Sequence, residues 1–360
     1  MLSKFISTER LIHSLKTAIA VIIGFGFAKV INLQADQWIV ITIIVVMCAQ
    51  LYVGSVLQKA YLRFLGTLLG CLLAAFTIVV FGNTHLAVAI TIGLSSFLFS
   101  YYATGQENFG YAGTLGAVTT AIIMLGQVPT VIFAAERFLE ISAGLLIATL
   151  VSQFILPIHA RTHLKRSQTE TLKQLRSYYE TTLSSQSPAP RDNRDLDEAI
   201  VKSLLKQRQL AKESVNEKLG STFDTAHFMQ TLYFEREILR AITFMHLALR
   251  EINRADIIIH QANAFHHFND AVLRIIDALI LTIQSGNPPP QAIPAPTLTN
   301  LKHDFQNNSD ISSRHDLIYI DGFLFSAEVL AKGLIRLAKL YSVPMLQEQT
   351  AVEMSTPTGL

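Results

Sequence analysis

Arg63 is followed by three small residues at helical spacing, since Gly66, Thr67 and Gly70 stand at positions i+3, i+4 and i+7 from it. In a helix the four residues share one face. A guanidinium beside a face with so few side-chain atoms could bind a carboxylate through two parallel hydrogen bonds. Two other interpretations stay open: Gly66 and Gly70 form a GxxxG pattern that lets helices pack closely, and Arg63 could anchor a helix in lipid headgroups.

A second group of charges opens the stretch "AAERFLEISAGLL", which contains Glu136, Arg137 and Glu140. Arg137, Glu140 and Gly144 stand at i, i+3 and i+7, so the arginine and the second glutamate can pair on one helix face. Ionisable groups at membrane depth are costly and therefore indicate function. If the helix begins near Val131, however, Arg137 lies only about 9 Å inside it, and anchoring at the membrane interface is an equal alternative.

Motifs of soluble enzymes do not occur in the sequence. It has no glycine-rich phosphate loop, no GxSxG turn and no cysteine pair with zinc spacing. His266 and Asp270 stand four residues apart, but no second pair of metal ligands accompanies them. We therefore expect neither an enzyme nor a cofactor, a metal ion or a nucleic-acid partner.

Composition divides the chain into two parts. Half of the residues are hydrophobic, and the mean hydropathy of +0.37 is higher than in most soluble proteins. Residues 1–160 hold 7 of the 29 basic and 5 of the 27 acidic residues, which leaves 22 of each kind to residues 161–360. This division predicts a transmembrane domain over 1–160 and a water-exposed domain over 161–360.

Six apolar stretches of the first part approach the roughly 17 to 25 residues that a membrane-spanning helix needs. They cover residues 14–31, 38–53, 64–81, 85–101, 111–126 and 131–158, with short polar turns between them. The second part places apolar residues three and four apart among charges, as amphipathic helices do. The predicted fold is all-α, with a six-helix transmembrane bundle followed by a cytoplasmic α-helical domain.

Basic residues predict the orientation in the membrane, because Lys and Arg collect in cytoplasmic loops. With six spans, three basic groups fall on one side: Lys4, Arg10 and Lys16, then Lys59 and Arg63, then Arg161, Lys165 and Arg166. Both termini are therefore expected in the cytoplasm. The segment 316–341 is not counted as a seventh span, since Asp321, Glu328 and Lys332 would each cost about 2.5 to 3.5 kcal/mol at the bilayer centre.

Three segments in order resemble a known family. They are "LKTAIAVIIGFGF", "WIVITIIVVMCAQLYVGSVLQKAYLRFLGTLLGCLLA" and "ERFLEISAGLLIATLVSQFILP". Over residues 14–158 the pattern is similar to the membrane half of the fusaric acid resistance family, also called the aromatic acid exporters. The positions that match are Lys16, Trp38, Lys59, Arg63, Gly66, Thr67, Gly70 and Arg137, with Glu136 and Glu140 beside the motif.

The resemblance implies an efflux permease of the cell inner membrane for aromatic carboxylic acids or related toxic organic anions, driven by protons. A looser similarity to the plant aluminium-activated malate channels implies an anion channel as the alternative. A third alternative is a membrane anchor without transport, whose helical domain binds a partner. Many family exporters are close to twice this length, so we expect this chain to form a homodimer in membrane lipid; the need for a periplasmic adaptor stays open.

Overall fold

The structure is a computed structural model that describes residues 8–31, 37–105, 109–126, 129–183, 194–217, 223–252, 263–298 and 314–346. These residues form eleven helices and two strands of two residues each, so the all-α prediction is confirmed. The chain divides into two compact units. The first unit comprises residues 1–160 with 213–223, and the second unit comprises residues 161–212 with 224–360.

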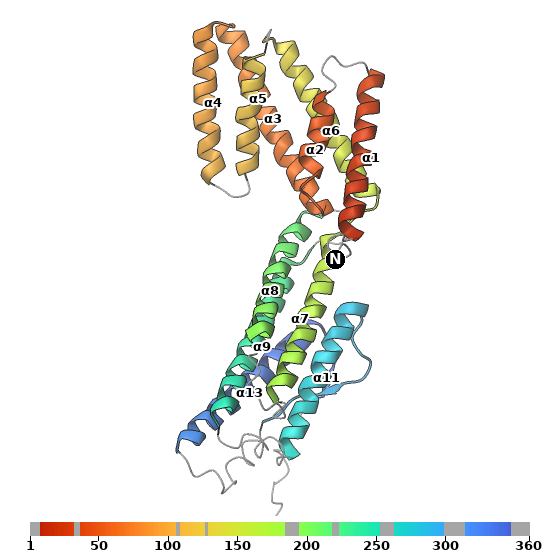
Figure 1. The fold of residues 1–360 in the computed structure, drawn as a ribbon, viewed down its shortest axis with the longest axis vertical. Helices are drawn as coiled ribbons and strands as arrows, with labels where there is room; N and C mark the ends of the chain where they lie inside the picture. Colours follow the sequence, from red (N-terminus) through yellow and green to blue (C-terminus); the bar gives the residue numbers. More distant parts are fainter. Residues whose placement is uncertain are drawn as a thin grey trace, which may run out of the picture. The chain divides into compact units, whose positions relative to one another are not determined.

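Six helices build most of the first unit (Figure 1). They are α1 (Thr8–Ile31), α2 (Gln37–Met47), α3 (Val53–Phe81), α4 (His85–Gly105), α5 (Gly110–Met124) and α6 (Val131–Phe154). By length and composition α1, α3 and α4 could cross a membrane. The apolar helices α2 and α5 are shorter, with 11 and 15 residues, and α6 has 24 residues but carries three charged side chains. Six complete spans therefore remain a prediction.

The start of α3 differs from the sequence-based expectation. Residues 54–63 were expected to form a polar turn before a helix at 64, but α3 begins at Val53 and continues through them. The reason is that Val56 and Ala60, four residues apart, are both buried in the core with α2 and α6. A helix can therefore form here although its other face is polar. Arg63 consequently lies about 15 Å from the start of α3 and not at its head.

Two apolar clusters hold the first unit together. One joins α1, α2, α6 and the start of α3, with Ile39, Ile43 and Leu145 among its buried members. The other joins α3, α5 and α6 around Ala74 and Ile123. Much of the remaining apolar surface of the unit is exposed, which fits helices that face lipid.

The second unit contains α7 (Ala160–Leu183), most of α8 (Arg194–Val215), α9 (Thr225–Glu251), α11 (Asn263–Ser285) and α13 (Arg314–Leu340). Strand β1 (Ile293–Pro294) pairs in parallel with β2 (Met345–Leu346). Helices α9 and α13 pack side by side in opposite directions, since Thr231 hydrogen-bonds Tyr341 while Gly333 lies against Ile238. Their facing sides are apolar, which is the usual source of stability in such a bundle.

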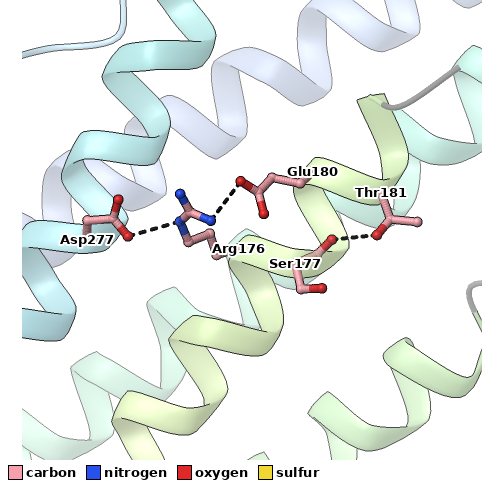
Figure 2. A network of polar contacts seen from close by, with 5 residues as sticks. All are labelled: Arg176, Ser177, Glu180, Thr181 and Asp277. Atoms are coloured by element: carbon pink, nitrogen blue, oxygen red, sulfur yellow. Dashed lines mark hydrogen bonds and ion pairs between the residues drawn. The ribbon is translucent and has the colours of Figure 1, made fainter. Parts of the chain in front are cut away.

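A polar network at the surface of the second unit connects α7 with α11 (Figure 2). The Arg176 Nε atom lies 2.9 Å from Asp277 Oδ1, and its Nη1 atom donates to Glu180 Oε1 at 2.7 Å. One turn away, the Thr181 hydroxyl donates to the Ser177 carbonyl. The network is partly exposed, so it contributes little energy and mainly fixes how the two helices face each other.

Glu235 is a fully buried carboxyl group on α9. No basic side chain forms an ion pair with it in the part of the chain that the structure describes. Burial raises the pKa of Glu235 from 4.5 to about 8, and the Gln207 amide offsets only part of this rise. The carboxyl group therefore keeps its proton at neutral pH, because the ionised form would be poorly solvated here.

We expect Glu235→Gln to remove a pH dependence of stability. Between about pH 4.5 and about pH 8 the folded chain holds a proton that the unfolded chain releases, so the free energy of unfolding falls as pH rises across this window. The slope approaches about 1.4 kcal/mol per pH unit. Hydrogen exchange of α9 amides in the full chain, corrected for intrinsic rates, should show this slope in the wild type and none in Glu235→Gln.

The matched control for this experiment is Glu170→Gln, which removes an exposed carboxylate from α7. It should retain the wild-type slope, because an exposed group has nearly the same environment in the folded and unfolded chain. A wild-type slope in Glu235→Gln would show that Glu235 does not hold the proton.

Candidate functional site

Arg63 points into the first unit and not toward lipid. Its side chain on α3 is almost fully buried, and its Nη2 atom donates to the Thr42 hydroxyl of α2 at 3.3 Å. Within the described residues, no carboxylate forms an ion pair with it. A buried guanidinium without an ionic partner is costly unless it serves a purpose, and this burial argues against headgroup anchoring.

Arg137 lies in a cage of two aromatic rings and one carboxylate. Its guanidinium carbon is 5.1 Å from the centre of the Trp38 ring and 4.7 Å from that of Phe133. Its Nη1 atom donates to Glu140 Oε2 at 2.8 Å, and both charged side chains are buried. The expected pairing of Arg137 with Glu140 is therefore present, and ring faces stabilise the cation further.

The two arginines both contact α2, about one turn apart. Phe64 and Phe138, their neighbours in sequence, have ring centroids only 5.5 Å apart. Arg63 contacts Thr42 on α2, and Arg137 contacts the Trp38 ring on the same helix. Trp38 stands four residues before Thr42, which corresponds to about 6 Å along the helix axis. Helices α3 and α6 therefore each bring one arginine to α2.

Two lysines of the family pattern lie nearer the end of the unit where α2 finishes. Lys16 on α1 is fully buried, and His13, one turn before it, lies beside the last residues of α2. Lys59 is half-buried and precedes Arg63 by one turn, with its Nζ atom 5.3 Å from the centre of the Tyr111 ring. The carbonyl end of a helix attracts cations, which accounts for basic groups gathering around the end of α2.

Glu136 differs from its neighbour Glu140. Its side chain is partly exposed, and within the described residues no ion pair joins it to Arg137. The two glutamates stand four residues apart and so lie on the same side of α6, but only Glu140 is buried. Of the two, only Glu140 belongs to the geometry around Arg137.

The small face after Arg63 is a packing seam between α3 and α5. A side chain on Gly66 would meet the backbone carbonyl of Ala112, and one on Gly70 would come within 2.6 Å of the Gly116 carbonyl oxygen. Thr67 is also buried in this face. The geometry therefore favours the packing interpretation of the GxxxG pattern, because the backbones leave no space for a substrate between them.

Sequence reasoning missed the contribution of residues 213–217 to the first unit. The backbone of Glu213 lies against Gly54 at the start of α3, and Asn216 donates to the Gln58 amide oxygen at 3.0 Å. The Glu217 carboxylate is buried and accepts a hydrogen bond from the Ala160 amide at 2.6 Å. No local sequence pattern predicts this packing, since these residues have the composition of the end of a polar helix.

The arrangement holds two buried guanidinium groups, of which Glu140 pairs with one. Arg63 and Arg137 provide the two guanidinium groups, and a carboxylate is their best-matched partner. Trp38 and Phe133 lie against the Arg137 guanidinium, and the rings of Phe64 and Phe138, which directly follow the two arginines in the sequence, contact each other. Since Glu140 balances one of the two guanidinium charges, a single negative charge on a ligand would balance the other.

Comparison with known proteins identifies the relatives of this chain and its family. Inner membrane protein YeeA of Escherichia coli (strain K12) is 21% identical over 316 residues, which cover 87% of this chain and 86% of that protein. Multidrug resistance protein MdtO is 29% identical over 154 residues in Shigella flexneri and in E. coli K12, covering 42% of this chain and 22% of MdtO. The model of the fusaric acid resistance protein family matches residues 10–224, which include every residue of the site described above. The chain belongs to the fusaric acid resistance protein family.

Proposed function

We propose that this chain is an efflux permease of the inner membrane for aromatic carboxylic acids or closely related organic anions, driven by protons. The observation that carries the proposal is the pair Arg63 and Arg137, both buried and both in contact with α2, with the rings of Trp38 and Phe133 beside the Arg137 guanidinium. Family membership and the names of the relatives, an inner membrane protein and a multidrug resistance protein, support efflux in general. The aromatic acid substrate rests on the residues of the site.

Glu140 provides a route for proton coupling. When ionised, it holds Arg137 through the 2.8 Å hydrogen bond and leaves that guanidinium unavailable. Protonation of the carboxylate removes its charge, so Arg137 can turn to a substrate carboxylate instead. Release of the proton re-forms the ion pair and displaces the substrate. One proton therefore moves with each substrate anion in the same direction, so protons drive export when the pH is lower on the side where the substrate binds.

Transport in proteoliposomes tests the proposal. Purified protein should move aromatic carboxylates faster than aliphatic ones, and a pH gradient should drive accumulation against the substrate gradient. Glu140→Gln should abolish accumulation but permit downhill movement, because its amide no longer exchanges a proton. Equal flux with and without the gradient would instead indicate an anion channel, and no flux of any substrate would indicate a membrane anchor.

A pathway for an aromatic acid requires more enclosing helices than the first unit of a single chain supplies. The match to MdtO covers only 22% of that longer protein, so relatives exist with much additional chain. We propose that this chain compensates by forming a homodimer, with a two-fold axis that repeats both arginines. A periplasmic adaptor is a further proposed partner, since efflux across the outer membrane would need one.

Topology follows from the basic loops and is tested with reporter fusions. Fusions after Ser55, Glu107 and Ser167 should report cytoplasm, and fusions after Asn83 and Gln127 should report periplasm, because Lys and Arg mark the cytoplasmic side. Glu107 and Gln127 lie outside the described residues. A cytoplasmic signal after Asn83 would contradict the six-span arrangement with both termini in the cytoplasm.

A further inference from the structure

The outer surface shared by α9 and α13 is more apolar than a water-exposed surface should be. Tyr233 and Phe244 on α9 are 58% and 59% exposed, and Phe325 on α13 is 69% exposed. The three aromatic side chains border one hollow of about 380 Å³ between the two helices. Single exposed apolar residues are ordinary, but several around one hollow mark an interaction surface. We call this surface the α9/α13 face.

Charged groups of both signs lie in the same hollow. Arg236 and Arg240, one turn apart on α9, border it, and Glu237 lies between them in the sequence. Neither arginine forms an ion pair within the described ranges. The Glu237 Oε2 atom is buried and has no hydrogen-bond partner there. The face therefore offers donors and an acceptor that the described residues of the same chain do not satisfy.

This combination matches a second copy of the chain. In a two-fold contact each copy presents the same surface, so arginines of one copy meet the glutamate of the other twice. Aromatic residues and arginine are also the residues that contribute most to protein interfaces. A strongly acidic partner fits less well, because Glu237 would repel it. Residues 161–360 carry 22 basic and 22 acidic residues, so long-range repulsion between copies is small.

We propose that the α9/α13 face is a dimerisation surface, in which Phe244 and Phe325 pack across the two-fold axis and Arg240 pairs with Glu237 of the second copy. The choice of occupant rests on the homodimer proposed above, but it does not depend on any transport activity. It places a specific contact in the second unit, whereas the proposed anion site belongs to the first.

Mass measurements on the full chain in nanodiscs test the proposal, with dilution to obtain a dissociation constant. Phe244→Glu and Phe325→Glu should each raise this constant about 30-fold or more, as loss of a central interface residue does. The matched control is Leu281→Glu, which adds the same charge at a 59% exposed leucine of α11 and should leave the constant unchanged. Hydrogen exchange of the buried side of α9 confirms that each variant is folded.

Exchanging the charges of Arg240 and Glu237 tests the proposed ion pair directly. Arg240→Glu and Glu237→Arg should each weaken the dimer, and the double variant should restore it, because both pairs then re-form with reversed signs. Wild-type dimerisation by Phe325→Glu and by both charge variants would overturn this surface while leaving a homodimer in place. A monomeric wild-type chain would overturn the homodimer as well. Protection of the face by lipid at every protein concentration would assign it to the membrane surface and overturn the proposal.

Discussion

Replacing Arg137 by Gln will abolish efflux of aromatic carboxylates while the protein still inserts and keeps its native size. Gln is shorter than Arg and uncharged, so it has no charge to bind a carboxylate and no cation to place over the Trp38 and Phe133 rings. It also leaves the buried Glu140 carboxylate without its ionic partner. Loss of one partner of a buried pair costs about 3 to 5 kcal/mol, which corresponds to a rate loss of more than 100-fold if it acts on transport.

Initial efflux rates in proteoliposomes measure this effect. The matched control is Arg166→Gln, which removes an exposed guanidinium from α7 and should transport at the wild-type rate. Arg63→Gln should also abolish efflux, since Arg63 is the buried guanidinium that a substrate charge would balance. Transport at the wild-type rate by either buried variant would show that the residue serves insertion or packing only.

The geometry around Arg137 was largely predictable from the sequence. Spacing of i, i+3 and i+7 placed Arg137, Glu140 and Gly144 on one face, and the structure has the ion pair on that face. It also has Gly144 against the Ile39 carbonyl and Thr42, so the same face packs on α2. Helical periodicity fixes such relations within one element, because 3.6 residues per turn leave little freedom.

Relations between helices were not predictable in the same way. Nothing in the local sequence brings both Arg63 and Arg137 to α2, because this depends on where α3 begins and how it packs on α6. The apolar-run criterion placed the start of α3 at 64, whereas buried Val56 and Ala60 extend the helix back to Val53. The shift of about ten residues moves Arg63 from the end of a helix into its body. This position favours carboxylate binding by Arg63 over anchoring in lipid headgroups.

Buried polar groups in the second unit were equally difficult to predict from the sequence. Glu235 stands in a helix whose sequence alternates charged and apolar residues, so it reads as one more solvated carboxylate. Only packing of α9 against its neighbours shows that it is fully buried and that its pKa is raised to about 8. A periodic pattern predicts which face is apolar on average, but it does not identify the single polar residue that is enclosed.

Gly66→Val will destabilise the first unit by roughly 3 kcal/mol or more, at the upper end of what over-packing costs. The added side chain meets the backbone carbonyl of Ala112, which can move only if α5 moves with it. Gly93→Val is the matched control, because nothing lies within 4 Å of a side-chain carbon built at Gly93 on α4. Both changes put the same branched residue into a helix, so helix propensity cancels between them.

The buried thiol of Cys71, next to the seam residue Gly70, reports the outcome directly. With the exposed Cys48 changed to Ser, Cys71 is the remaining cysteine of the chain, and its reaction with a fluorogenic maleimide on heating follows opening of α3 from α5. Gly66→Val should shift this transition to a markedly lower temperature than Gly93→Val. Equal transitions would mean that α3 and α5 separate without cost, and the glycines would then be free to border a substrate pathway after all.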